Sequence, residues 1–166
     1  MAIVLTHTPG APTANSLCSR EFADSYHEMR GHNQSWTDAD VPTREKFLVW
    51  ATSLLSQESY KGWKTTREAA LPFPRAGLVD GDGWPISSTD VPKSVQEAAA
   101  EFAFILMGED RTLDEGGLVE IGGKVGPINN PDRYVRNVLP ASVRDKLRDF
   151  LKNRTGSDGN IRIGRR

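Results

Sequence analysis

Few residues in this sequence have both the type and the spacing that chemistry requires. Asp80, Asp82 and Gly83 begin like a calcium-binding loop, because carboxylates at alternate positions can converge on one cation. Trp84 and Pro85 then stand where that loop needs a further ligand and a glycine. The better interpretation is a reverse turn in which Asp-Gly supplies the tight bend, so no metal site is expected.

The remaining reactive side chains do not form a recognisable catalytic set. His7, His27 and His32 are scattered without ligand spacing and are interpreted as surface histidines. The run GGKVGP at 122–127 lacks the preceding strand and the following Ser or Thr of a phosphate-binding loop. Cys18, the single cysteine, cannot form an internal disulfide and is expected to be a semi-buried thiol in a reducing compartment. We therefore expect neither an enzyme nor a bound cofactor.

One short segment offers the chemistry of nucleic-acid binding. Proteins that bind single strands combine basic side chains with exposed aromatic rings on which bases stack. The segment YKGWKTTR supplies both, in Tyr60, Lys61, Trp63, Lys64 and Arg67. Aromatic residues at a helix end are more often the edge of a core or a subunit contact. Sequence-independent binding of single-stranded DNA is therefore the alternative function here and not the main one.

Length and composition limit the class of protein. The chain has 166 residues, of which 37% are hydrophobic, enough for one core. Its 21 basic residues nearly balance its 22 acidic residues, and the net charge of -1 gives no overall attraction to nucleic acid or to an anionic membrane. No apolar run approaches the roughly 20 residues that cross a bilayer, so no membrane contact is expected.

The elements that must position these residues are mainly helical. Apolar residues recur at helical spacing in four segments, over residues 19–30, 43–60, 92–107 and 140–152. In the first of them Phe22, Tyr26 and Met29 share one face, which we expect to be buried, and His27 lies on the opposite face. The predicted fold class is mainly α: a small helical bundle with a long ordered loop, a short β-hairpin and an extended C-terminal arm.

The long connection over residues 71–92 is predicted to be ordered. Four prolines fix φ along it and reduce the entropy that is lost on ordering. Its apolar side chains can hold it against the helices, and long structured loops usually carry function. The residues expected to pack there or at a subunit interface are Phe73, Pro74, Arg75, Trp84 and Ile86. Of these, we expect Phe73 to pack within the chain, whereas Trp84 is left open between core and interface.

Two segments near the C-terminus are expected to need a partner. GGLVEIGGKVGPI at 116–128 predicts a hairpin with its two-residue turn at Gly122-Gly123, and a mobile loop is the alternative. Its expected contact residues are Val119, Ile121, Gly122, Gly123 and Val125. A helical domain of residues 1–153 is expected to precede a flexible docking arm of residues 154–166. The docking residues of that arm are Asn160, Ile161, Arg162, Ile163, Arg165 and Arg166.

Three stretches of the chain together resemble a known family of proteins. They are SLCSREFADSYHEMRGHNQSW at 16–36, LPFPRAGLVDGDGWPI at 71–86 and VPKSVQEAAAEFAF at 91–104. The shared pattern places Tyr26, Arg30 and Gly31 shortly before Trp36, and later a Pro-Arg-x-Gly run ahead of a Val-Pro helix start. The family consists of small tailed-bacteriophage proteins that are often labelled DnaT-like single-stranded DNA-binding and that look like head-to-tail adaptors, also called connector or head-completion proteins.

The resemblance implies a structural virion protein and not an enzyme. Such a subunit assembles, typically twelve-fold, into a ring beneath the portal of the capsid, where it extends the DNA channel and offers a platform for the tail. The expected partners are therefore the portal protein, tail or neck proteins and further copies of the chain, with double-stranded DNA passing through without sequence recognition. The expected location is the virion neck, after assembly in the host cytoplasm, and the C-terminal arm is expected to dock to the portal.

Overall fold

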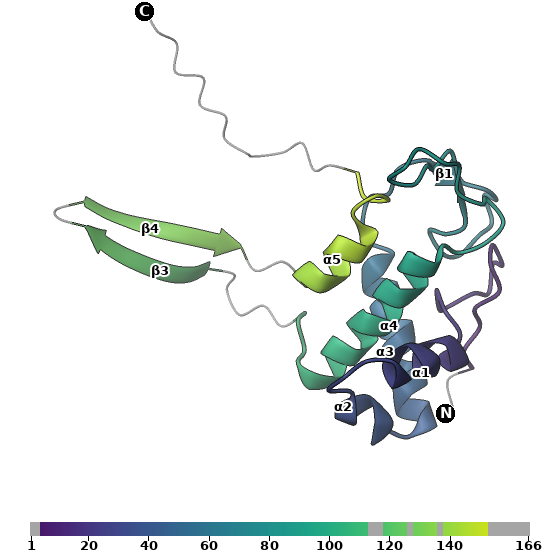
Figure 1. Ribbon diagram of the computed structural model, residues 1–166, viewed down its shortest axis with the longest axis horizontal. Coiled ribbons are helices and arrows are strands. Elements are labelled where there is room, and N and C mark those ends of the chain that lie inside the picture. Colours follow the sequence, from purple (N-terminus) through teal and green to yellow (C-terminus); the bar gives the residue numbers. More distant parts are fainter. Residues whose placement is uncertain (1–3, 113–117, 126–127, 136–137, 153–166) are drawn as a thin grey trace, which may run out of the picture.

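Helix α4 (Lys93–Gly108) lies at the centre of the fold, and the other helices pack around it (Figure 1). The computed structural model describes residues 4–112, 118–125, 128–135 and 138–152. Within these residues the helices that contact α4 are α1 (Arg20–Glu28), α2 (Gln34–Thr37), α3 (Val41–Leu55) and α5 (Ala141–Leu147). The chain is thus mainly helical, and the predicted fold class is confirmed.

The composition of α4 explains its central position. Four alanines of this helix, Ala98, Ala99, Ala100 and Ala103, are fully buried. Small side chains let neighbouring helices approach closely, and the distance between packed helix axes depends on the side chains at the contact. Val95 and Phe102 on the same helix are also fully buried. The helix therefore packs against neighbours on several sides.

The helix ends follow local rules that the sequence also shows. Ser19 caps α1, since its Oγ accepts a hydrogen bond of 3.1 Å from the Phe22 amide. Asp40 caps α3 in the same way, through a 3.1 Å bond from the Thr43 amide to its Oδ1. Helix α4 begins directly after Pro92, which cannot donate a backbone hydrogen bond. Caps and prolines therefore set where these helices begin.

Several predicted boundaries were too long. Helix α3 ends at Leu55 and α5 at Leu147, so the helical pattern does not continue to Tyr60 or to Lys152. Instead, Tyr60 and Leu151 form an isolated antiparallel bridge between two extended segments. Backbone pairing with a distant segment takes the place of the last helical turns.

The predicted buried face of α1 was right only in part: Phe22 and Tyr26 are partly buried against the core, but Met29 is not. Met29 is 81% exposed, whereas Ala23 and His27 are fully buried. The reason is a set of polar partners on α4. The His27 Nε2 atom donates to the Ala100 carbonyl at 3.1 Å, and the buried Glu101 carboxylate accepts hydrogen bonds from Tyr26 and Arg30. A buried polar group is tolerated when it is hydrogen-bonded, so these polar residues lie inside.

Cys18 lies just before α1 and is 1% exposed, so its thiol is buried and not semi-buried. Burial raises the pKa of this thiol to about 12, because the surrounding protein disfavours the charged thiolate. A thiol with so high a pKa is a poor nucleophile at neutral pH.

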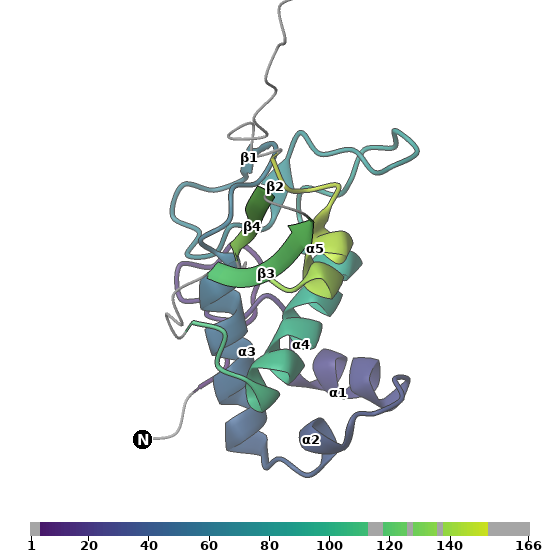
Figure 2. The same cartoon turned by 90° about the vertical axis from the view of Figure 1, so that its left-hand side faces the viewer.

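The loop between α3 and α4 is ordered and carries two very short strands. Strand β1 (Trp63–Lys64) pairs antiparallel with β2 (Arg75–Ala76), with Trp63 opposite Ala76. Phe73 anchors this loop: it is 1% exposed and makes edge-to-face contacts with Tyr60 and Phe150, at ring-centroid distances of 4.9 and 5.8 Å. β1 and β2 lie at the end of the molecule opposite α1 and α2 (Figure 2).

The hairpin has a different turn from the one predicted. β3 (Leu118–Val125) pairs antiparallel with β4 (Ile128–Val135) and extends to one side of the helices (Figure 1). Gly122 and Gly123 lie within β3, opposite Pro131 and Asn130, and not at the turn. The prediction failed because residues 129–135 supply a full partner strand, which the search for a tight Gly-Gly turn did not consider. The expected arm, residues 154–166, lies outside the described residues, so the domain division there stays a prediction.

Two aromatic residues of the long loop are expected to contribute very differently to the free energy of unfolding. Phe73→Ala should lower the free energy of unfolding by about 3–5 kcal/mol, because it removes a fully buried ring and leaves a cavity. Trp84→Ala is the control, since Trp84 is 71% exposed and its loss should change stability by no more than about 0.5 kcal/mol. Chemical denaturation measures both. Equal effects of the two substitutions would contradict the assignment of Phe73 as the anchor of the loop.

The buried His27 should make stability depend on pH. Burial lowers the pKa of His27, an effect that Arg30 reinforces and that Ala100, Glu101 and Asp24 oppose. The Nδ1 atom is buried without a hydrogen-bond partner among the described residues. Because the unfolded state keeps a pKa near 6.5, it binds the proton more tightly than the folded state does. Stability should therefore fall as the pH decreases below about 6.5.

A comparison of variants isolates this effect. In His27→Phe the free energy of unfolding should change little between about pH 7.5 and 5.5, a range above the titration of most carboxylates. His32→Asn is the control, because His32 is exposed at a positive φ of 58° that Asn also adopts. The control should keep the acid-dependent loss of the unmodified protein. A His27→Phe protein that loses stability as steeply as the control would refute the role of this histidine.

Candidate nucleic-acid interface

Trp63 is the most prominent aromatic side chain of the cluster that the sequence singled out. It lies in β1 and is 64% exposed, whereas Tyr60 of the same segment is buried. Lys61, Lys64 and Arg67 flank it and are all exposed. An exposed ring that is close in the chain to three exposed cationic residues is typical of surfaces on which bases stack.

Gly77 supports the Trp63 ring from the protein side. A Cβ atom placed on Gly77 would lie 2.5 Å from Cζ3 and 2.8 Å from Cη2 of Trp63, closer than real Cβ contacts. Only a residue without a side chain lets the ring lie this close to the backbone. Gly77 also has a φ of +74°, which side chains disfavour. We call the Trp63 ring and its Gly77 support the tryptophan platform.

Arg75 holds the backbone on which the platform is built. Its guanidinium donates to the carbonyls of Lys61 at 2.7 Å and Gly62 at 2.8 Å. Weaker bonds reach the carbonyls of Tyr60 at 3.3 Å and Pro72 at 3.2 Å. Burial lowers the pKa of Arg75, yet an arginine remains cationic at neutral pH. Since all four acceptors are neutral carbonyls, the positive charge stays at this surface.

The two lysines beside Trp63 are also bonded to neutral groups. Lys61 Nζ donates to the Asp149 carbonyl at 2.9 Å, and Lys64 Nζ donates to the Ala69 carbonyl at 2.8 Å. Neither bond cancels the ammonium charge. Both side chains are therefore held near the surface with their charge available to an anion.

The segment after α5 braces this surface. The Lys61 amide donates to the Phe150 carbonyl at 2.8 Å, and the Lys152 amide donates to the Ser59 carbonyl at 2.9 Å. Together with the bridge between Tyr60 and Leu151, these bonds fix the start of the loop to the end of the last helix. Segments that are about 90 positions apart in the chain are thus bonded to each other beneath this surface.

Trp84 is exposed in a different electrostatic setting. Trp84 follows a turn in which Asp80 Oδ1 accepts hydrogen bonds from the Asp82 amide at 3.0 Å and from the Trp84 amide at 2.8 Å. This is the reverse turn that the Asp-Gly pattern predicts. Two carboxylates beside the ring would repel phosphates, so Trp84 is a poor base-stacking residue. Among the residues that the structure describes, no group of three potential metal ligands comes together.

The other residues predicted for interfaces have varied positions. Phe73 and Pro74 are buried within the chain, and Ile86 is partly buried against the core. For Val119, Ile121, Gly122, Gly123 and Val125 the structure gives the backbone pairing of β3. The six arm residues from Asn160 to Arg166 lie outside the described part of the chain. A subunit-interface role for these residues stays a prediction.

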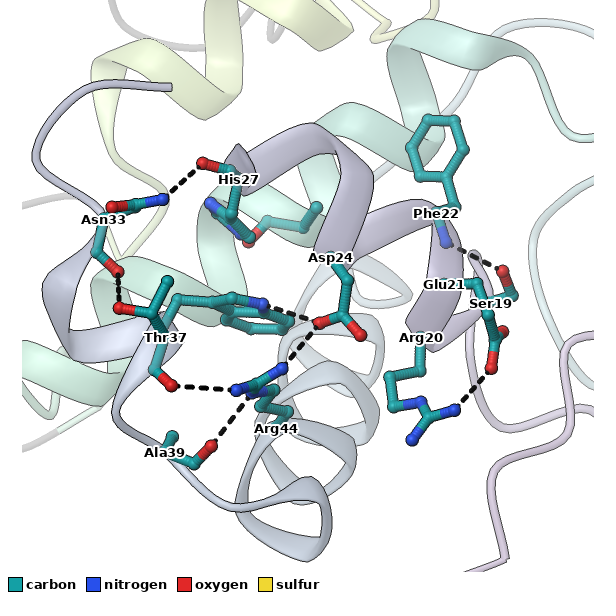
Figure 3. Close-up of polar contacts among 12 residues, drawn as sticks. Ser19, Arg20, Glu21, Phe22, Asp24, His27, Asn33, Thr37, Ala39 and Arg44 are labelled. Atoms are coloured by element: carbon teal, nitrogen blue, oxygen red, sulfur yellow. Dashed lines mark hydrogen bonds and ion pairs between the residues drawn. The ribbon is translucent and has the colours of Figure 1, made fainter. Parts of the chain in front are cut away.

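A second polar cluster joins α1, α2 and α3 and is structural (Figure 3). Asp24 Oδ1 accepts hydrogen bonds from Trp36 Nε1 at 2.8 Å and from Arg44 Nη1 at 3.1 Å. Arg44 also donates to the carbonyls of Ala39 and Thr37, both at 3.0 Å. The polar atoms of this cluster satisfy one another, so it explains how short α2 is held rather than how a ligand binds.

Sequence reasoning found Trp63 and its cations but missed the roles of Gly77 and Arg75. The signal was present, because both belong to the Pro-Arg-x-Gly run at residues 74–77. Arg75 was expected to pack in the loop or at a subunit interface, and Gly77 served only as part of the resemblance. In the structure the arginine holds the carbonyls of the loop, and the glycine leaves room for the Trp63 ring.

The fold and this surface define a small, mainly helical protein that presents an exposed tryptophan close in the chain to three exposed cations. The family described as "Putative DnaT-like ssDNA binding protein" matches the chain over residues 1–166. The chain therefore belongs to this family. No curated protein and no solved structure matches it. None of the described helices is long and apolar enough to cross a membrane.

The family assignment corrects the expected function. A head-to-tail adaptor, with portal and tail partners and a twelve-fold ring, was the wrong expectation, because the matching family is one described by DNA binding and nothing supports a connector. The motifs behind that expectation have structural explanations: Tyr26 and Arg30 satisfy Glu101, and Trp36 bonds Asp24. Motifs of this kind specify a fold and not an assembly.

Substitution of Gly77 tests the platform. Gly77→Ala should displace the Trp63 ring, because the new methyl group would overlap it. Gly83→Ala is a matched control: its φ of +87° carries the same backbone strain, but a Cβ there meets nothing within 4 Å. Acrylamide quenching of tryptophan fluorescence, with Trp63→Phe as the reference, should change in Gly77→Ala only. If quenching changes equally in both variants, backbone strain is the cause, and the contact between Gly77 and the Trp63 ring is refuted.

Proposed function

We propose that this protein binds single-stranded DNA, and that one base of any identity stacks on Trp63. The observation that carries the proposal is the exposed Trp63 ring, which is 64% accessible and held on Gly77, with the exposed cations Lys61, Lys64 and Arg67 within four positions of it in the chain. The membership of a family described as DnaT-like ssDNA binding supports the same class of ligand. Single strands are favoured over duplex because a base must be unstacked to lie on the ring.

The energies fit a modest, salt-dependent affinity. Stacking on one aromatic ring contributes about 1–3 kcal/mol per base, irrespective of base identity, because every base has a π face. The whole chain has a net charge of -1, so attraction to phosphate must come from the local cations and not from the overall field. Each lysine that neutralises a phosphate of a single strand releases counterions, so the affinity falls as salt is added.

Binding of a fluorescently labelled oligothymidylate tests this function. Trp63→Ala should weaken binding by about 5- to 150-fold, the equivalent of one lost stacking contact. Lys64→Gln should lower the slope of log affinity against log salt by about 0.7. Trp84→Ala is the control, because the neighbouring carboxylates of Asp80 and Asp82 repel phosphates and no base is expected to stack on that ring.

Two results would contradict the proposal. The first is unchanged affinity in Trp63→Ala, measured on protein with the thermal stability of the unmodified chain. The second is an affinity that does not depend on salt between low and physiological concentrations.

A further inference from the structure

A small cavity adjoins the tryptophan platform. It has a volume of about 150 Å³ and is lined by Lys61, Gly77, Leu78, Val79, Asp80 and Asp149. Gly77 is common to both features, since it supports the Trp63 ring and lines the cavity. Lys61 is also shared, as one of the cations flanking Trp63. The cavity therefore borders the surface on which the proposed strand would lie.

The polar groups of the cavity are mostly hydrogen-bond acceptors. Asp149 uses its main-chain carbonyl to bind Lys61, and its side chain is 49% exposed. Its Oδ2 lies 3.8 Å from where a Cβ on Gly81 would be, so this carboxylate reaches the loop. The Asp149 Oδ1 atom is 3.8 Å from Arg148 Nε, a long contact for an ion pair. The carboxylate therefore keeps lone pairs for a further donor.

Asp80 adds a second acceptor. Both bonds that its side chain accepts in the turn go to Oδ1, from the amides of Asp82 and Trp84. Its Oδ2 atom is the oxygen that can accept from a ligand. With two carboxylates and one ammonium group, the cavity carries a net negative charge and does not suit a phosphate. It suits an uncharged group that donates hydrogen bonds.

We infer that this cavity takes the exocyclic amino group of the base next to the one stacked on Trp63, and that the protein thereby prefers cytosine to thymine. The inference rests on the proposed function. Cytosine presents an N4 amino group, which Asp and Glu side chains accept in known protein–DNA contacts, whereas thymine presents the O4 acceptor and a methyl group at that position. Carboxylate oxygens facing O4 would repel it. Stacking on Trp63 does not distinguish one base from another, whereas the cavity distinguishes cytosine from thymine.

Competition between two single-stranded homopolymers measures the preference for cytosine over thymine. Oligodeoxycytidylate and oligodeoxythymidylate of equal length compete for the protein at mildly alkaline pH, which keeps cytosine unprotonated. The unmodified protein should bind the cytidylate about tenfold more tightly, the effect of one good base contact. The readout is the ratio of the two affinities, because removal of a negative charge raises the affinity for every strand.

Two variants and a control connect the ratio to the cavity. Asp149→Asn should bring the ratio close to one, since an amide can donate to thymine O4 as well as accept from cytosine N4. Asp80→Asn should lower the ratio too, while its amide oxygen keeps the turn. Asp145→Asn removes the same charge from an exposed position on α5 that does not line the cavity, and its ratio should equal that of the unmodified protein.

The outcomes separate this inference from the function on which it rests. Equal affinity for both homopolymers, or tighter binding of thymidylate, overturns the cavity assignment alone if Trp63→Ala still weakens binding. A cytosine preference that survives in both Asp149→Asn and Asp80→Asn also overturns it. Failure to bind either homopolymer overturns the proposed function, and the inference with it.

Discussion

The burial of α4 is the constraint on which the rest of the structure depends. Four other helices pack on it, and its Glu101 carboxylate is enclosed among them. A buried carboxylate is costly unless it is paired, and Tyr26 and Arg30 of the α1 region provide the partners. His27 bonds the preceding carbonyl of α4. The polar side of α1 thus faces the core because its hydrogen-bond partners, the Glu101 carboxylate and the Ala100 carbonyl, lie on α4. Met29 is exposed as a consequence.

The tryptophan platform depends on the same core through Phe73. This ring packs between Tyr60, which follows α3, and Phe150, which follows α5. Strand pairing within the loop is limited to the two-residue ladder of β1 and β2 and an isolated bridge between Val79 and Pro85, so it satisfies few backbone groups. The Arg75 guanidinium takes over this role by donating to four carbonyls. One charged side chain therefore gives the loop its shape and also leaves a positive charge beside Trp63.

The distribution of charge matters more here than its sum. The two exposed tryptophans of the loop between α3 and α4 have sequence neighbours of opposite sign: Lys61, Lys64 and Arg67 are close to Trp63 in the chain, and Asp80 and Asp82 precede Trp84. With a net charge of -1, the chain has no general attraction to DNA, so the proposed binding depends on local cations. A nearly neutral member of a family described by ssDNA binding can thus present one surface with the chemistry for stacking a base. The charges beside the two tryptophans also show why exposure alone does not identify that surface.

The sequence alone determined the helical class, the starts of the helices at residues such as Ser19 and Pro92, and the cluster that contains Trp63, because caps, periodicity and composition are local properties. Only the tertiary structure decided that His27 is buried, that Gly122 and Gly123 lie within a strand, and that Gly77 supports an exposed ring. Each of these depends on a partner that local patterns do not specify: Ala100 is 73 positions from His27, and the partner strand of β3 follows it in the chain. The buried face of a helix or strand depends on the residues that pack against it, and these residues come from distant parts of the chain.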